Sequence, residues 1–96
     1  MPSAYLIANV DVHDPVQYEE YKKLSTLAMK ASGAEVCIRG GQVEVMEGNW
    51  APSRVVMLKF PSMDAARAFY NSPEYAAAIQ ARQGIADMRM IIVEGA

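Results

Sequence analysis

The chain contains few of the residues that most often build metal and redox centres. Its 96 residues include one cysteine and one histidine, and no carboxylates cluster around either. A lone cysteine excludes an intrachain disulfide, and we expect Cys37, which falls in a predicted strand, to be a buried, unreactive thiol. The Gly40-Gly41 pair lacks the spacing of a dinucleotide-binding or phosphate-binding loop. We therefore expect neither a metal nor a cofactor.

An excess of charge of one sign and long apolar runs are also missing. The formal net charge is −2, and Lys22-Lys23, the only adjacent cationic pair, lies among acidic residues. This pattern excludes the basic surface of a nucleic-acid-binding protein. No apolar run approaches the ~20 residues that a membrane-spanning helix needs, and we expect no leader segment before the first strand. We therefore expect a cytoplasmic protein that binds neither nucleic acid nor membranes.

What the chain does contain is clear periodicity. Alternation of apolar and polar residues predicts strands over residues 5–12, 35–39, 42–47, 54–60 and 88–94. Apolar residues at helical spacing predict helices over residues 15–32, from residue 63 to a break at 71–74, and over 75–83. Regular structure therefore accounts for most of the chain.

Several residues mark the ends of the predicted helices. Asp14 is suited to cap the first helix, because Gln17 three residues later can complete a capping box. Gly33 is the expected residue just beyond the end of that helix. Ser62 and Ser72 are expected to cap the second and third helical segments, and a proline follows Ser72 at the first helical position.

The predicted order of elements is that of an α+β ferredoxin-like fold, βαββαβ, with a four-stranded antiparallel sheet. The segment 42–47 adds an extra hairpin to this fold, and one domain spans residues 1–96. The strands carry apolar residues on both sides, whereas the helices can cover only one face of the sheet. We therefore expect a second copy of the chain to cover the other face, giving a homodimer through the sheet faces.

The middle of the chain and the second helical region carry a family pattern. Arg39-Gly40-Gly41, Glu47-Gly48-Asn49-Trp50-Ala51-Pro52 and the segment 65–75 resemble the DUF1330 family, a domain of unknown function. The resemblance implies the dimeric α/β-barrel superfamily, in which two ferredoxin-like subunits join their sheets. That superfamily includes cofactor-free monooxygenases, small-molecule isomerases, haem enzymes and ligand-binding regulatory domains. Phe69 and Ala34 depart from the pattern, since tryptophan and glycine are common at these positions.

Two arginines border the predicted extra hairpin. Arg54 has the strand parity of apolar Val56, so its side chain starts on an apolar sheet face, and Arg39 lies on the preceding strand. A buried guanidinium needs a carboxylate, a carbonyl or an anionic ligand. Two interpretations are open: Glu47 pairs with the arginines and holds the hairpin, or the arginines bind a small carboxylate or phosphate.

Two residues of the last helical region are further candidates for ligand binding. Arg82 follows Tyr75 at helical spacing, so its guanidinium either reaches an internal carbonyl or carboxylate or faces a ligand between helices and sheet. The Tyr75 hydroxyl either belongs to the core or orients the bound molecule. Asn9, on the first strand, is a candidate for supplying further polarity to that pocket.

The remaining candidates lie in loops. Trp50 is either an anchor of the dimer interface or a pocket wall, and Gly40-Gly41 are expected to form a bulge or hairpin corner. His13, beside Asp14 in the sequence, is a weak candidate for a catalytic base that could also add polarity to the pocket. We expect Asp14 to be committed to capping instead.

Two functional hypotheses follow. The first is a dimeric barrel that binds a small, acidic organic molecule, as a cofactor-independent enzyme of the monooxygenase or isomerase type that the resemblance implies. The second is a non-catalytic ligand-sensing or protein-interaction module whose arginines are structural. An enzyme requires unpaired polar groups that converge on a concave pocket, whereas structural arginines have internal partners. The two hypotheses therefore differ in whether the polar groups of the pocket are paired.

Overall fold

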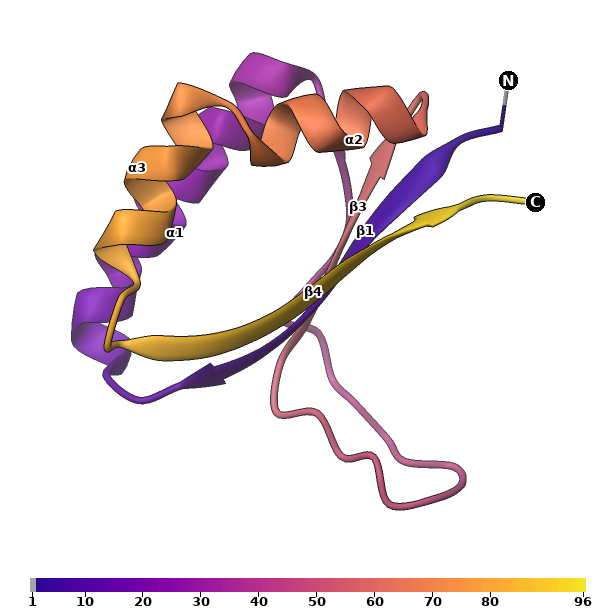
Figure 1. Ribbon diagram of the computed structural model, residues 1–96. Coiled ribbons are helices and arrows are strands. Elements are labelled where there is room, and N and C mark those ends of the chain that lie inside the picture. Colours follow the sequence, from indigo (N-terminus) through magenta and orange to yellow (C-terminus); the bar gives the residue numbers. More distant parts are fainter. Residues whose placement is uncertain (1) are drawn as a thin grey trace.

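The computed structural model describes residues 2–96 and has the predicted ferredoxin-like architecture (Figure 1). Its elements in chain order are β1 (Ala4–Val12), α1 (Pro15–Ser32), β2 (Glu35–Arg39), β3 (Val55–Phe60), α2 (Met63–Tyr70), α3 (Pro73–Ala81) and β4 (Ala86–Glu94). The strands form one antiparallel sheet in the order β2-β3-β1-β4, and the helices cover one face of it. No helix within residues 2–96 combines the length and hydropathy needed to cross a membrane.

The capping residues predicted from the sequence are confirmed, whereas the last helix ends at Ala81 and Gln17 bonds to the Asp14 side chain instead of completing a capping box. The Asp14 carboxylate accepts hydrogen bonds from two backbone N–H groups of the first turn of α1 at 3.2 and 3.1 Å, and the Gln17 side chain donates to it at 3.0 Å. The Ser62 and Ser72 hydroxyls accept from the backbone N–H groups three residues further on. Gly33 follows α1 with a φ of 73°. These contacts satisfy backbone groups that a helix end leaves without partners.

The core lies between the helices and one face of the sheet. In β1 every second residue is buried against the helices: Ala4, Leu6, Ala8 and Val10. The ring of Phe69 lies between two other aromatic rings, with centroids 5.4 Å from Phe60 and 4.7 Å from Tyr75. Burying a side chain of this size contributes about 1.5–3 kcal/mol, so the aromatic cluster fixes α2 and α3 on the sheet.

Residues 40–54 form an arm that projects from the sheet (Figure 1). The prediction of a strand over residues 42–47, and with it an extra hairpin, is wrong for the subunit. Within the described chain that segment has no neighbouring strand to complete its backbone hydrogen bonds. Large apolar side chains of the arm are exposed, including Met46 at 84% and Trp50 at 65%.

Cys37 is exposed, so the prediction of a buried thiol is wrong. It lies in β2, an edge strand in which every residue is exposed. The pairing of β2 with β3 shifts register between Val36 and Ile38, which places Cys37 at an irregularity of the strand. Alternation in the sequence does not tell which strand will lie at the edge of the sheet.

Candidate functional site

Tyrosine hydroxyls meet between α1, α3 and the sheet. The Tyr21 and Tyr75 hydroxyls share a buried hydrogen bond of 2.7 Å, and both lie within reach of the Met88 sulfur, at 3.8 and 3.9 Å. The Tyr18 ring stacks on that of Tyr21 with centroids 5.1 Å apart. We call the surrounding space the inner cavity; its lining includes Tyr18, Tyr21, Ser25, Arg39, Arg54 and Tyr75.

Burial keeps these hydroxyls protonated. Loss of solvent raises the pKa of Tyr21, the neighbouring Tyr75 hydroxyl raises it further, and the Arg82 guanidinium opposes the change. Burial also raises the pKa of Tyr18, against the lowering effect of Arg54. At neutral pH both tyrosines are therefore neutral hydrogen-bonding groups rather than bases.

Tyr21→Phe is expected to weaken the fall in stability at high pH. A tyrosine pKa raised by folding contributes stability that is fully present below the unfolded value of 10.0 and is lost as the pH rises toward the folded value. Above pH 10.0 the Tyr21 hydroxyl therefore lowers the unfolding free energy by up to about 1.4 kcal/mol for each further pH unit. Urea unfolding between about pH 8 and 11 measures the slope, and Tyr70→Phe, at an exposed tyrosine, is the control. An equal slope in Tyr21→Phe and wild type would contradict the prediction.

Arg54 brings a positive charge into the inner cavity. Its Nε atom is buried and has no hydrogen-bond partner among the described residues. Its guanidinium lies beside the Tyr18 hydroxyl and against Gly40, where a Cβ atom would lie 2.6 Å from the Arg54 Cζ. Gly40 has a φ of 74°, a conformation that favours glycine. The missing side chain at Gly40 therefore both permits the turn and makes room for the guanidinium.

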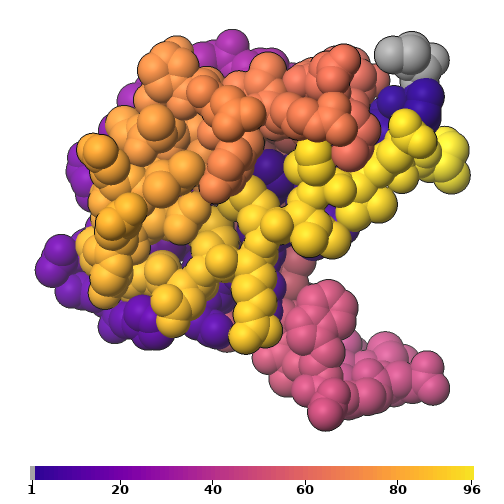
Figure 2. All heavy atoms as spheres, in the orientation of Figure 1, coloured from indigo at the N-terminus to yellow at the C-terminus, as the bar shows by residue number. Residues whose placement is uncertain are grey.

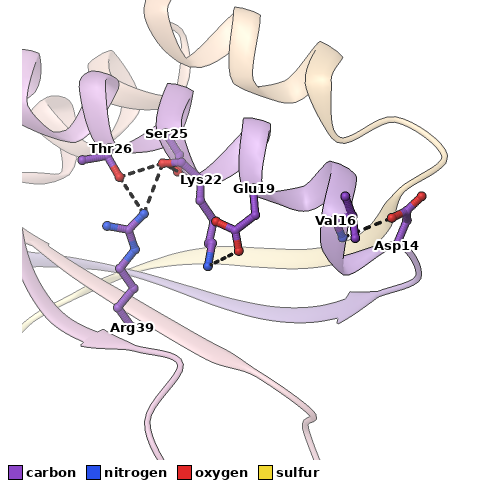
Figure 3. Close-up of polar contacts among 7 residues, drawn as sticks. All are labelled: Asp14, Val16, Glu19, Lys22, Ser25, Thr26 and Arg39. Carbon is purple, nitrogen blue, oxygen red and sulfur yellow. Dashed lines mark hydrogen bonds and ion pairs between the residues drawn. The ribbon is translucent and has the colours of Figure 1, made fainter.

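Arg39 also lines the inner cavity and is held by α1 (Figure 3). Its Nη2 donates to the Thr26 hydroxyl at 2.7 Å and to the Lys22 carbonyl at 3.3 Å, and both acceptors are neutral. The predicted pairing of Glu47 with Arg39 and Arg54 is wrong. Within residues 2–96 Glu47 forms no ion pair, because the arm carries it away from the sheet.

A second hollow, the outer cleft, lies between β4 and the helices α2 and α3, as Figure 2 shows. Arg82, the residue after α3, contributes to its wall, and the Arg82 Cζ lies 5.8 Å from the centre of the Tyr21 ring. The Arg82 Nε atom is buried without a hydrogen-bond partner in the part of the chain that is described. Three apolar residues line both hollows and form a shared floor: Leu6, Met88 and Met90.

The two hollows differ in the room they offer. The inner cavity has a volume of about 20 Å³, enough for one ordered water molecule. The outer cleft has a volume of about 370 Å³, which suits a small organic molecule. A ligand larger than water would therefore lie mainly in the outer cleft and reach the tyrosine hydroxyls across the shared floor.

Every charged side chain that lines the two hollows is cationic. They account for five of the nine lysines and arginines: Lys22, Arg39, Arg54, Arg67 and Arg82. Among the described residues, none of the 11 acidic side chains lines either hollow. Lys22 and Arg67 have carboxylate partners at 2.9 Å, in Glu19 and Asp64. Arg54 and Arg82 have none within residues 2–96, so their charges remain available to a ligand.

Some of the predicted site residues lie outside the two hollows. Asn9 is on the side of β1 that faces away from the helices, and its buried Oδ1 has no hydrogen-bond partner among the described residues. The His13 Nε2 is exposed and contacts the Asp87 carboxylate at 2.9 Å. Trp50 and Gly41 lie exposed in the arm. The remaining predicted ligand residues line the hollows: Arg39, Arg54 and Tyr75 the inner cavity, and Arg82 the outer cleft.

The sequence interpretation missed the contribution of α1 to the site. Tyr18, Tyr21 and Ser25 lie at helical spacing on the face that packs on the sheet, and all are buried. The sequence did contain a signal for this contribution, namely three hydroxyl groups on the helix face that packs on the core. A buried hydroxyl needs a hydrogen-bond partner, so three of them on one face indicate a polar site. The identity of the partner, Tyr75 for Tyr21, depends on how α3 docks on α1.

Comparison with known proteins identifies the family. The model of a domain of unknown function, DUF1330, matches residues 3–96. The chain belongs to the DUF1330 family. This match confirms the resemblance inferred from the sequence. No curated protein matches the chain.

Solved structures share the fold of this DUF1330 domain. A protein of unknown function from Rhodopseudomonas palustris is 20% identical, with a TM-score of 0.76 over 99% of this chain and 83% of its own. SnoaB, a cofactor-independent oxygenase from Streptomyces nogalater, is 13% identical, with a TM-score of 0.66 over 97% and 92%. A dimeric ferredoxin-like protein of unknown function from Thermobifida fusca is 16% identical, with a TM-score of 0.66 over 97% and 91%. At these identities the similarity concerns the fold alone.

Proposed function

We propose that this DUF1330 domain binds a small organic anion between its helices and its sheet. The proposal rests on the charges around the two hollows. Both hollows are lined by cationic side chains, and neither is lined by a carboxylate of the described chain. Arg54 and Arg82 matter most, since each has a buried Nε without a partner within residues 2–96. A buried donor on a permanent cation requires an acceptor, and an anionic ligand supplies one.

The surrounding groups indicate what kind of anion suits the site. The hydroxyls of Tyr21 and Tyr75 bond to each other, so the one that accepts in this pair can donate its own hydrogen to a carboxylate or enolate oxygen. The shared floor, with Met88 and Met90, is apolar and deformable, so it can accommodate a hydrocarbon skeleton. The ligand class we propose is therefore a small acid with an apolar body.

A cofactor-independent oxygenase is the second candidate function. It is supported by the fold shared with the Streptomyces oxygenase and by donors that would stabilise an enolate. Within the described residues, however, neither hollow is lined by a histidine or carboxylate that could remove a proton. This favours ligand binding without catalysis. Oxygen uptake in the presence of an acid that binds would instead support the oxygenase.

The proposed function is tested by ligand-dependent thermal shifts with a panel of small organic acids. An acid at about 100 times its dissociation constant should stabilise the wild type by about 2.7 kcal/mol. Arg54→Gln is expected to lose this response, because the ligand loses its charged partner. Lys30→Gln removes a charge from the exposed end of α1 and should respond as the wild type does. A wild type that responds to no acid, or an Arg54→Gln variant with the full response, would exclude the proposed site.

We further propose that the domain forms a homodimer through the sheet face that the helices leave uncovered. On that face Ile91 is 59% and Val93 42% exposed, and Ile91 pairs with Ile7 of β1, which in turn pairs with Met57 of β3. An uncovered apolar sheet face is the kind of surface that a second layer buries. The dimeric state of the Thermobifida protein, which has the same fold, supports the proposal.

Ile91→Lys is expected to convert the proposed dimer into a monomer, because it places a charge on the sheet face that the partner would bury. Light scattering at micromolar concentration should change from twice the chain mass to 10.5 kDa. Val16→Lys, at a residue of α1 that is 82% exposed, should leave the dimer intact. A wild-type mass of 10.5 kDa would refute the dimer.

A further inference from the structure

We infer that the inner cavity and the outer cleft bind one ligand at two points, and that the ligand is a small organic acid with two anionic groups. One acid group lies at Arg54 and the other at Arg82. The inference deepens the proposed function and rests on it. It adds a ligand class, the di-acids, that the general preference for anions does not specify.

The two arginines are alike in having no carboxylate partner within residues 2–96. Each has a buried Nε without an acceptor, and neither forms an ion pair within residues 2–96. Arg67, which lines the same cleft as Arg82, differs because Asp64 neutralises it at 2.9 Å. A ligand with one acid group would pair with one guanidinium and leave the other donor unsatisfied. Two cations that each keep an unsatisfied buried donor therefore indicate a ligand with two negative charges.

Stacked tyrosine rings connect the two points. Arg54 lies beside Tyr18, whose ring stacks on Tyr21 with centroids 5.1 Å apart. The Arg82 Cζ lies 5.8 Å from the centre of that same Tyr21 ring. The Tyr21 hydroxyl points to Tyr75 in the inner cavity, at 2.7 Å. The two guanidiniums therefore adjoin the same pair of stacked rings, and the ligand that we infer would contact both of them and the hydroxyl pair.

The volumes of the two hollows indicate which part of the ligand each of them would hold. Leu6, Met88 and Met90 line both hollows, so the two hollows are adjacent and share apolar side chains. The inner cavity, with about 20 Å³, admits only a group of about the size of water, such as a carboxylate oxygen. The outer cleft, with about 370 Å³, takes the carbon skeleton and the second acid group.

The test compares acids that have the same carbon skeleton and differ in one carboxylate. Suitable pairs are butyrate with succinate, hexanoate with adipate and 4-methylbenzoate with terephthalate, titrated by calorimetry at constant ionic strength. The wild type should bind the di-acid of at least one pair about tenfold or more tightly, because a second charge-assisted contact forms. Arg82→Gln should lose this ratio and keep mono-acid binding. Arg67→Gln, the matched control in the same cleft, should keep the ratio.

The outcomes separate the two-point inference from the proposed function. Equal affinities within every pair, or a ratio that survives in Arg82→Gln, would overturn the inference while anion binding stands. Failure of the wild type to bind any acid would overturn the proposed function as well. If Arg82→Gln does not fold, Arg82→Lys decides instead, since lysine keeps the charge but loses the planar donor group and should lower the ratio.

Discussion

Gly40→Ala is expected to destabilise the domain by about 2–5 kcal/mol and to abolish anion binding. The residue has a φ of 74°, and a side chain there costs about 1–2 kcal/mol of backbone strain. The new Cβ would also lie 2.6 Å from the Arg54 Cζ, and overpacking of this kind costs about 1–3 kcal/mol. The guanidinium must move out of the inner cavity to relieve the collision. Urea unfolding measures the loss of stability, and thermal shifts with small organic acids measure the loss of anion binding.

Gly33→Ala is the matched control for this change. Gly33 has a φ of 73°, but nothing lies within 4 Å of the position of its Cβ. The control therefore carries the backbone strain without the collision, and it should cost about 1–2 kcal/mol and leave acid binding intact. Equal destabilisation by the two substitutions would show that Gly40 does not position Arg54.

Arg54→Met is expected to increase the unfolding free energy of the ligand-free domain by about 1–2 kcal/mol while it abolishes acid binding. The cation is half-buried, and its Nε has no partner among the described residues, so desolvation of the guanidinium is not compensated inside the subunit. Methionine removes that cost and keeps an apolar side chain of similar length at this position. A residue retained for binding at the expense of stability behaves in this way.

Lys30→Met makes the same change of charge at an exposed position of α1. It is expected to alter the unfolding free energy by less than about 0.5 kcal/mol and to leave acid binding unchanged. Denaturant unfolding at equal protein concentration measures the unfolding free energy of the wild type, Arg54→Met and Lys30→Met. If Arg54→Met were less stable than wild type by more than about 1 kcal/mol, Arg54 would be a structural residue, as one of the two sequence-based interpretations holds.

Features that depend on neighbours in the sequence were predictable. Asp14, Ser62 and Ser72 cap helices because their side chains reach backbone groups within three residues. The order of strands and helices, and the side of β1 that is buried, follow from periodicity over a few residues. The segment 42–47 shows the limit of this reasoning. It has the alternation of a strand, but a strand needs a hydrogen-bonded neighbour, which the subunit does not supply.

Pairings between distant residues were not predictable in the same way. Glu47 is nearest to Arg54 in the sequence among the acidic residues of that region, yet the arm separates them. Arg39 instead bonds to Thr26, across the gap between β2 and α1. Asn9 is polar and lies on the same strand as Leu6 and Ala8, but its parity places it on the opposite face from the hollows.

The ferredoxin-like fold, the helix caps and the candidate arginines could be predicted from the residue pattern, because caps and periodicity are local properties. Which groups share a site depends instead on how the elements pack together. The hydrogen bond between Tyr21 and Tyr75 joins residues 54 positions apart, and the docking of α3 on α1 creates it. The same docking sets Arg82 against Tyr21 and leaves the acidic residues outside both hollows. The absence of internal partners for Arg54 and Arg82 in residues 2–96 therefore becomes visible only once the chain is folded.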